Sequence, residues 1–416
     1  MKIAIINHYA GSPALGMEYR PYYLAREWQK KGHAVVVISA SHSHVRTHQP
    51  QVSSSLQVEQ REGVEYVWIK TPPYEGNSVR RIFNMLIFVI KTWWHASALA
   101  RKYNFDVVIA SSTYPLDIYP ARRMASACKA PLVFEVHDLW PLSPMELGGY
   151  SKYHPFIATM QMAENYAYRH SSAVISMLPC AKEYMMAHGL APAKFFYVPN
   201  GICRDDWNQR KKLPPLHAET LQKEREKGRL LVGYAGTLGL ANALYSLIEA
   251  ARILQEEKVT FILTGQGPEK ENLIRKTREH HLSNVIFLPP VEKAMVPDLL
   301  EAMDVLYLGL QNQSLFRFGV SPNKLFDYMM AGKPVIQAIR AGNDLVREAG
   351  CGYTIEPENA EALAMAIRKI KSLPPEEQKK MGEAGKQYVL KNHTYEVLAE
   401  KFIAVLTRLA QRNEGR

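Results

Sequence analysis

Short apolar runs rich in β-branched residues alternate with helical stretches through most of this chain. Such alternation indicates parallel strands joined by helical crossovers, because parallel neighbours need long connections and helices must cover both faces of their sheet. The expected strands of the first half are Lys2–Ile6, Ala34–Ser39, Glu65–Ile69, Val107–Ala110, Leu132–Glu135, Ala173–Ser176 and Phe195–Val198. Those of the second half are Leu230–Tyr234, Thr260–Leu263, Val285–Phe287, Val305–Leu308 and Pro334–Ala338. The pattern predicts an α/β chain with two doubly wound parallel sheets.

Helical stretches separate most of these strands. In the first half they are Tyr19–Lys31, Val79–Lys102, Ile118–Ala127, His154–His170 and Ala181–Met186. In the second half they are Ala243–Gln255, Pro268–His280, Met295–Met303, Lys324–Met330 and Asp344–Ala349. A last helical region, Glu376–Arg412, has a break near Asn392.

The chain of 416 residues is long enough for two domains, each with its own core. The segment from Val198 to Gly228 is polar and basic and contains Pro214 and Pro215, which is typical of a linker. We expect a Rossmann-like domain at 1–202, a linker at 203–228, a second Rossmann-like domain at 229–390, and a C-terminal helix at 391–416 that packs on the first domain. Two such domains are expected to face each other across a ligand-binding cleft.

Composition limits the possible partners. The formal net charge of +11 favours a phosphate-bearing ligand, a nucleic acid or an anionic membrane. The basic residues are dispersed and no nucleic-acid-binding motif occurs, so no nucleic acid partner is expected. The four cysteines have no CxxC or zinc-site spacing and fit a reducing cytosol. No Asp-x-Asp occurs, so neither a metal site nor another cofactor is expected.

The segment Val79–Lys102 bears on a membrane partner. It is apolar and Trp-rich but is interrupted by Lys91 and His95, so no uninterrupted run reaches the ~18 apolar residues of a spanning helix. The N-terminal apolar run is only a few residues long, and we expect a buried strand there rather than a signal peptide. Basic residues border the segment, which is typical of a helix that lies on an anionic membrane surface. An ordinary domain helix with a wide buried face is the alternative.

The segment Phe316–Ile336, FRFGVSPNKLFDYMMAGKPVI, predicts an anion site. A Gly/Pro loop precedes a helix that begins near Lys324, and Gly332 follows the end of that helix. The helix directs unpaired backbone N–H groups towards the loop, and Lys324 adds a formal positive charge in its first turn. A cation is unfavourable there unless an anion binds beside it. Asp327, one turn later, could accept hydrogen bonds from a ribose diol.

Loops at the ends of the first-half strands supply further candidates. The loop after the first strand contains Gly16 and precedes Arg20, and it lacks the GxGxxG dinucleotide fingerprint. A bland Gly-rich turn and a close approach to a ligand both fit it. His137 and Asp138 follow the strand at Leu132, and Trp140 lies just beyond. They suit polar chemistry, and a buried turn with a capping Asp is the alternative.

Two glycine-rich loops follow strands of the second half. They supply Gly236, Thr237 and Gly239, and then Gly265, Gly267 and Glu269. Small residues there let a phosphate approach the backbone, although either loop alone also fits a tight turn. Val291 ends the next strand, where backbone groups could contact the edge of a base. The ordered series describes a nucleotide-binding second domain.

Over essentially its whole length the chain resembles the GT-B glycosyltransferases of family 4. The resemblance lies in GMEYR, the His137-Asp138 turn, PNGI at Pro199–Ile202, YAGTLG, TGQGPE and the VSPNKLFDYMMAGKPVI block. It extends to the branch that transfers N-acetylated amino sugars in bacterial surface-polysaccharide assembly. The family implies a GT-B fold and retention of anomeric configuration. It also implies that the domain at 229–390 binds a nucleotide-diphosphate sugar donor, UDP in this branch, and that the domain at 1–202 binds the acceptor.

The chain departs from the family pattern at two places. The family pairs two glutamates; the later one corresponds to Asp327 and the earlier one to Gly319, which has no side chain. The family's Arg and Lys after the first strand of the second domain are also missing, so the phosphate charge must be met elsewhere, and Lys324 and Arg317 are the available candidates.

The resemblance assigns roles. Lys324, Asp327 and His137 are the catalytic candidates, with His137 orienting or deprotonating an acceptor hydroxyl. The remaining donor-side candidates are Gly236, Thr237, Gly239, Gly265, Gly267, Glu269, Val291, Arg317, Phe318, Gly319, Val320, Ser321 and Asn323. The acceptor-side candidates are Gly16, Arg20, Asp138 and Trp140.

These roles predict a metal-independent hexosyl- or N-acetylhexosaminyltransferase. Its acceptor would be a lipid-diphosphate-linked molecule or a saccharide, and its location the cytoplasm or the inner face of the cytoplasmic membrane. A sugar-nucleotide epimerase and a non-catalytic nucleotide-sugar-binding protein remain as alternatives.

Overall fold

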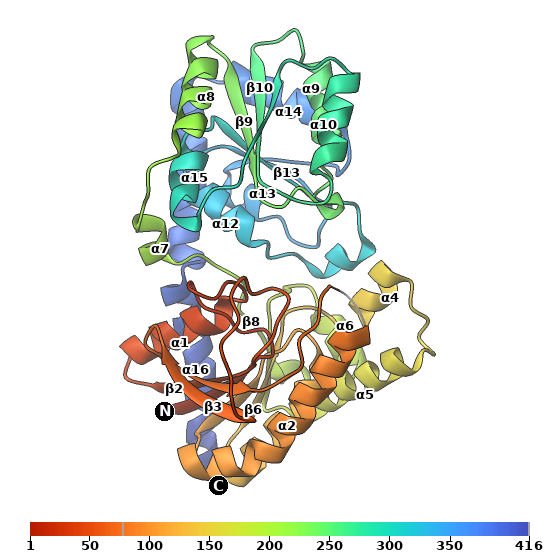
Figure 1. Cartoon of the computed structure of the whole chain (residues 1–416), viewed down its shortest axis with the longest axis vertical. Helices are drawn as coiled ribbons and strands as arrows, with labels where there is room; N and C mark the ends of the chain where they lie inside the picture. The colour runs from red at the N-terminus through yellow and green to blue at the C-terminus, as the bar shows by residue number, and fades with distance from the viewer. Residues whose placement is uncertain (77–78, 415–416) are drawn as a thin grey trace. The chain divides into compact units, whose positions relative to one another are not determined.

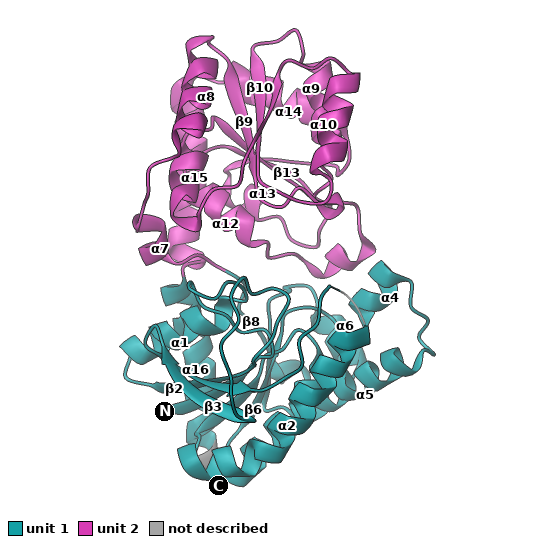
Figure 2. Cartoon of the chain, viewed as in Figure 1, with its two compact units in different colours: residues 1–200, 395–416 teal, residues 201–394 magenta. Residues whose placement is uncertain are grey.

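The computed structural model describes residues 1–76 and 79–414. The chain forms two compact units (Figure 2). The first unit consists of residues 1–200 and 395–416, and the second of residues 201–394. Each unit is a parallel sheet covered by helices, as the alternation of strands and helices predicts.

The first unit contains an eight-stranded sheet with the order β3-β4-β2-β1-β5-β6-β7-β8 (Figure 1). Its strands are β1 (Lys2–Ile6), β2 (Ala34–Ala40), β3 (Leu56–Arg61), β4 (Val64–Ile69), β5 (Val107–Ala110), β6 (Leu132–Val136), β7 (Ala173–Ser176) and β8 (Phe195–Tyr197). All neighbours pair in parallel except β3, which runs antiparallel to β4 at the edge. The central strands are buried and mostly apolar because helices cover both faces of the sheet.

Helices of the first unit connect these strands. They are α1 (Arg20–Lys30), α2 (Val79–Tyr103), α3 (Ile118–Cys128), α4 (Leu142–Gly148), α5 (Pro155–His170), α6 (Lys182–Ala187) and α16 (Tyr395–Glu414), with short 3-10 turns at Pro115–Asp117 and Pro192–Lys194. The last helix, α16, packs on α1. The Trp28 indole Nε1 donates to the Ala399 carbonyl at 3.0 Å, and its ring lies 5.1 Å from that of Phe402.

The second unit contains a six-stranded, fully parallel sheet with the order β11-β10-β9-β12-β13-β14. Its strands are β9 (Leu230–Ala235), β10 (Val259–Thr264), β11 (Val285–Leu288), β12 (Val305–Gly309), β13 (Val335–Ala338) and β14 (Gly352–Ile355). The strand order reverses between β9 and β12. The carboxyl ends of strands at such a reversal are the usual ligand site of an open parallel sheet.

Helices of the second unit cover both faces of that sheet. They are α7 (Arg204–Asn208), α8 (Pro215–Glu226), α9 (Leu244–Ile253), α10 (Lys270–Glu279), α11 (Val296–Glu301), α12 (Asn323–Met330), α13 (Leu345–Ala349), α14 (Ala360–Ser372) and α15 (Pro375–Asn392). Short 3-10 turns lie at Leu240–Asn242, Lys293–Met295 and Ser314–Phe318.

The expected linker at 203–228 is corrected by the structure. That segment belongs to the second unit and forms α7 and α8. Pro214 and Pro215 are the N-cap and first residue of α8 rather than helix breakers, a position at which proline is favoured. The buried residues Trp207 and Leu221 anchor the two helices in a core of the second unit.

Candidate functional site

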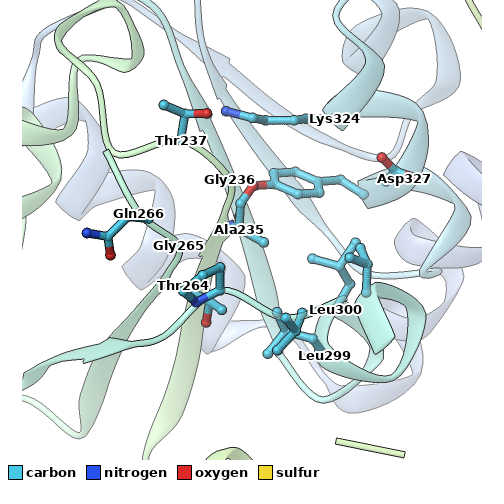
Figure 3. Close-up of a pocket in the computed structure, with 14 residues that line it drawn as sticks. Ala235, Gly236, Thr237, Thr264, Gly265, Gln266, Leu299, Leu300, Lys324 and Asp327 are labelled. Carbon is cyan, nitrogen blue, oxygen red and sulfur yellow. Dashed lines mark hydrogen bonds between the residues drawn. The ribbon is translucent and has the colours of Figure 1, made fainter. Parts of the chain in front are cut away.

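A pocket of about 370 Å³ opens at the carboxyl ends of β9, β10 and β11 (Figure 3). The loops after these strands and helices α11 and α12 form its walls. Its lining residues are Ala235, Gly236, Thr237, Thr264, Gly265, Gln266, Pro290, Val291, Val296, Leu299, Leu300, Lys324, Asp327 and Tyr328. The pocket therefore contains both candidate charged residues of helix α12 and the first glycine of each glycine-rich loop.

Lys324 reaches from the first turn of α12 to the loop after β9. Its amine donates hydrogen bonds of 2.7 Å to the Tyr234 hydroxyl and 3.0 Å to Asn242 Oδ1. In Figure 3 the amine points towards Thr237. Both protein partners are neutral, and burial lowers the pKa of Lys324 to about 8. A negative charge in the pocket would favour the ammonium form of this lysine.

Neighbouring atoms lie so close to three glycines of these loops that a side chain would not fit without displacing them. Gly236 has φ +144°, and a Cβ atom at this position would lie 2.8 Å from the Lys324 amine. A Cβ atom at Gly265 would overlap the Gly236 carbonyl oxygen, and one at Gly267 would overlap the Leu238 carbonyl oxygen. The two loops therefore pack backbone against backbone beside the lysine, which leaves space for a ligand next to main-chain groups.

Asp327 lies one turn after Lys324 and also lines the pocket. Burial raises the pKa of its carboxyl to about 7, and the positive charge of Lys293 opposes this rise only in part. The Tyr328 hydroxyl donates to the Ala235 carbonyl and accepts from the Ala235 N–H, which ties α12 to the end of β9. Lys324 and Asp327 are thus held on one rigid helix against the strand end.

The pocket lining includes six of the predicted donor-side and catalytic residues: Gly236, Thr237, Gly265, Val291, Lys324 and Asp327. The other donor-side candidates lie outside it: Gly239, Gly267, Glu269, Arg317, Phe318, Gly319, Val320, Ser321 and Asn323. Glu269 accepts from the Tyr245 hydroxyl and Asn272. Arg317 is exposed; it donates to the Ser314 carbonyl and stacks on Phe318 at 4.3 Å.

The loop before α12 is braced from another part of the chain. Val320 N–H donates to Asn343 Oδ1 at 2.8 Å, and Asn343 donates back to the Val320 carbonyl. Gly319 has φ +96°, a conformation that favours glycine. Gly319, which occupies the position of the family's earlier glutamate, therefore forms part of a turn of the backbone.

Sequence reasoning missed the apolar wall and the partners of Lys324. Val296, Leu299 and Leu300 come from α11, which was expected only as a helix. The hydroxyl of Tyr234 and the side chain of Asn242 hold the lysine amine, although only Gly236, Thr237 and Gly239 of that region were assigned a role. The only signal for this wall in the sequence was the i, i+3, i+4 spacing of Val296, Leu299 and Leu300, which places the three side chains on one face of α11.

In the first unit, His137 lies at the carboxyl end of β6 within a buried polar network. Its Nε2 is 3.4 Å from Glu135 Oε2 and 3.1 Å from the Ser111 hydroxyl. Glu135 in turn accepts from Arg20 Nε at 2.9 Å and from Ser111 at 2.6 Å. Arg20 also donates to the Val198 and Pro199 carbonyls. Arg20 therefore holds Glu135 in place, and Glu135 in turn orients the imidazole ring of His137.

The electrostatics of this network favour charged groups. Burial opposes ionisation of Glu135, yet the Arg20 guanidinium and the contacts with His137 and Ser111 hold its pKa at about 2. Burial would lower the pKa of His137, but the hydrogen bond to Glu135 and its charge raise that pKa overall. The contact with Glu135 therefore favours the imidazolium form of His137, which donates hydrogen bonds and cannot accept a proton.

The other acceptor-side candidates have different surroundings. Arg20 is fully buried, so its charge reaches His137 through Glu135 and it does not contact solvent. Gly16 has φ +101° and pairs with Arg46 in an isolated β-bridge, so the glycine loop is anchored. Asp138 is exposed, and Trp140 lies edge-on to Phe156 at 6.2 Å. The structure brings His137, Arg20 and Glu135 together and leaves Asp138 and Trp140 outside their network.

Helix α2 is the crossover between β4 and β5. By length and composition it is the one helix in the described residues that could cross a membrane, and a third of its most apolar window is buried inside the first unit. Asn84, Phe88 and Thr92 are buried on one face, whereas Phe83, Ile90 and Trp94 are 56%, 53% and 73% exposed. Because α2 covers the sheet with its buried face, its other face is the part available to a membrane surface.

No group of three or more His, Cys, Asp or Glu side chains that could hold a metal ion was found among residues 1–76 and 79–414.

Comparison with known families decides the class of protein. Residues 16–201 match the Glycosyl transferase 4-like domain, and residues 218–388 match the Glycosyl transferases group 1 family. The chain belongs to the GT-B glycosyltransferases of the family 4 type. The two matches correspond to the two units and confirm both the resemblance and the expected fold class.

Similar proteins include curated and solved examples. The chain is 23% identical over 348 residues to the probable glycosyltransferase WbjE of Pseudomonas aeruginosa, covering 82% of each chain. It is 23% identical over 363 residues to the putative colanic acid biosynthesis glycosyl transferase WcaI of Escherichia coli K12, covering 84% of this chain and 87% of the other. The structure of HepE of Anabaena in complex with UDP and glucose aligns with a TM-score of 0.66 at 17% identity, covering 98% and 99% of the two chains.

Proposed function

We propose that this glycosyltransferase moves a sugar from a UDP-sugar to a lipid-linked or saccharide acceptor during bacterial surface-polysaccharide assembly. The transferred sugar is an N-acetylated amino sugar, and its anomeric configuration is retained. The named role of WcaI in colanic acid biosynthesis and the UDP in the HepE complex support this proposal. The observation that carries it is the pocket in which Lys324 and Asp327 line one wall.

In this proposal Lys324 supplies the phosphate-binding charge that the loop after β9 lacks. Breaking the bond between sugar and phosphate leaves negative charge on the departing diphosphate, so a cation at that position stabilises the transition state. The amine of Lys324 already lies beside Gly236, although it comes from a different element. Its neutral partners, Tyr234 and Asn242, leave its charge available to the diphosphate.

Asp327 and the loop after β11 would hold the nucleoside. An ionised carboxylate accepts two hydrogen bonds, which suits the two ribose hydroxyls. Pro290 and Val291 line the same pocket, and their main-chain groups could meet a base edge. The binding of ribose hydroxyls would favour the ionised form of Asp327 and lower its pKa from about 7.

His137 would orient the acceptor or the donor sugar as a hydrogen-bond donor. Its raised pKa and its bond to Glu135 favour this part of the expected role over proton abstraction. The proton of the acceptor hydroxyl then passes to an oxygen of the leaving diphosphate. The protein operates in the cytoplasm, at the inner face of the membrane, with the exposed face of α2 against anionic lipid.

A panel of nucleotide sugars tests the donor assignment. We expect UDP-N-acetylhexosamines to raise the thermal unfolding midpoint more than GDP-sugars do, since a ligand at ~100 times its dissociation constant stabilises by ~2.7 kcal/mol. Transfer to a lipid-linked acceptor in the presence of EDTA then tests activity without a metal. Interconversion of the nucleotide sugar without an acceptor would favour an epimerase, and binding without turnover would favour a non-catalytic protein.

A further inference from the structure

A group of basic and aromatic side chains lies at the carboxyl edge of the first sheet, separate from the His137 network. We call it the basic cluster: Tyr9, His44, Arg46, Tyr74 and Arg81. Tyr9 follows β1, His44 and Arg46 follow β2, and Tyr74 follows β4. These three strands are neighbours in the sheet, and Arg81 is in the first turn of α2.

Direct contacts connect most of the basic cluster. Arg81 Nε and Nη2 lie 3.4 and 3.3 Å from the Tyr9 hydroxyl. The Tyr9 ring lies 5.6 Å from the His44 ring, and His44 Nδ1 is 2.8 Å from the Tyr74 hydroxyl. These contacts link Arg81, Tyr9, His44 and Tyr74; Tyr9 and Tyr74 are buried, Arg81 is partly exposed and His44 is exposed.

Arg46 contributes a buried charge with unused donors. Its side chain is 5% exposed and donates through Nη2 to the Ala40 carbonyl, while its Nε and Nη1 have no hydrogen-bond partner within residues 1–76 and 79–414. Its guanidinium lies 5.2 Å from the Trp68 ring. A buried guanidinium with unmade hydrogen bonds is costly, and an anion beside it would offset that cost.

The charges that act on the cluster are mainly positive. Burial first, and then the charges of Arg81 and His42, lower the pKa of His44 to about 4. Burial and the charges of Arg46 and Arg81 likewise lower the pKa of the adjacent His8. A bound anion would offset the repulsion between these positive charges.

The exposed apolar face of α2 begins directly after Arg81. Ile82, Phe83, Leu86 and Ile90 are 36%, 56%, 42% and 53% exposed and follow one another at helical spacing. A ligand that suits both features has a phosphate head next to a hydrocarbon chain.

We propose that the basic cluster binds the phosphate of a lipid-linked acceptor, with the hydrocarbon chain along the exposed face of α2. This inference rests on the proposed function and assigns the acceptor to a class, an amphiphilic phosphate or diphosphate. Arg81 and His44 are its accessible contacts, and Arg46 supplies charge from behind them.

Calorimetric titration with farnesyl diphosphate tests this site. Saturating UDP is present throughout, so that the pocket of the second unit is filled before the diphosphate is added. We expect Arg81→Gln to weaken farnesyl diphosphate binding about tenfold or more, because a charge-assisted hydrogen bond is lost. Arg80→Gln removes the same charge one residue earlier at an exposed position and should change binding less than about twofold.

Inorganic pyrophosphate and Phe83→Ser separate the phosphate from the lipid. We expect pyrophosphate to bind more weakly than farnesyl diphosphate and Phe83→Ser to remove most of that difference. Equal affinities for the two ligands would overturn the lipid part, and equal effects of Arg81→Gln and Arg80→Gln would overturn the site. If UDP binds and farnesyl diphosphate does not, this inference fails alone, whereas absence of UDP binding is a failure of the proposed function.

Discussion

The amine of Lys324 donates a 2.7 Å hydrogen bond to the Tyr234 hydroxyl, which joins the first turn of α12 to strand β9. These residues are 90 positions apart in sequence. The contact places a cation beside the loop after β9, which lacks the Arg and Lys expected there from the family resemblance.

Proton uptake should accompany nucleotide binding. Lys324 has a pKa of about 8, so at pH 8.5 much of it is neutral, and the diphosphate of UDP should raise that pKa and draw in a proton. Calorimetry of UDP binding in buffers of different ionisation enthalpy measures this uptake. In Lys324→Arg, which stays ionised, the uptake should vanish while binding persists; unchanged uptake would contradict the assignment.

Replacing Asp327 with Asn should weaken UDP binding but stabilise the free protein. Because its pKa is raised to about 7, the ionised carboxyl destabilises the free protein above pH 7, and this cost declines as the pH falls through 7 towards 4. Asp327→Asn should raise the unfolding midpoint at pH 8 by about 3 °C or more and have little effect near pH 4. UDP affinity should fall about 10- to 100-fold, while Asp327→Glu retains it.

Glu135 should control the titration of His137. Glu135→Gln removes the carboxylate that raises the pKa of His137, so the pH at which the imidazolium is lost should decrease. If transfer requires the imidazolium, the alkaline limb of the kcat/KM profile moves to lower pH. Ser111→Ala removes a neutral partner of both Glu135 and the His137 ring but leaves the carboxylate charge in place, so it should move the limb less. An alkaline limb that stays in place in Glu135→Gln would show that His137 acts in another way.

An added methyl group at Gly236 should displace the lysine. A Cβ atom there would meet the end of the Lys324 side chain, which can move, and its positive φ adds strain of about 1 kcal/mol. We expect Gly236→Ala to fold and to bind UDP about tenfold more weakly. Gly239→Ala is the matched control, since its nearest contact would be 3.6 Å. Similar UDP affinities for the two variants would argue against close approach at Gly236.

Flotation with vesicles tests the membrane surface of α2. The protein should float with vesicles that contain anionic lipid and less with neutral ones, because apolar burial and basic charge act together. Trp94→Ser, at a side chain 73% exposed, should reduce flotation, and Met365→Ser, at a side chain 59% exposed in the second unit, should not. Failure of the unmodified protein to float would remove the peripheral attachment.

The central strands and the α12 site could be predicted because their signals are local. Apolar runs such as Val107–Ala110 and the sequence around Lys324 carry their own pattern. The edge strands β3 and β14 were missed, since neither is fully buried and polar residues interrupt the runs. The segment at α8 was misassigned because Pro214 and Pro215 fit a helix start as well as a linker.

The contacts of the site were less accessible to sequence reasoning. The sequence around Lys324 does not indicate that its amine contacts Tyr234 and Asn242, because those contacts depend on how β9 and α12 pack. For the same reason Arg20 was expected to face an acceptor, although its distant partner Glu135 keeps it buried. Sequence patterns identified the chemical groups, and tertiary packing decided their partners.

The first unit is built from two separate parts of the chain, because helix α16 returns to it after the second unit. In α16, Ala399 and Phe402 cover Trp28 of α1. During synthesis, the earliest part of the chain must therefore wait for nearly four hundred residues before its own surface is completed. A fragment ending at residue 200 would expose an indole that the intact protein keeps dry, so the two halves are a poor choice for separate expression.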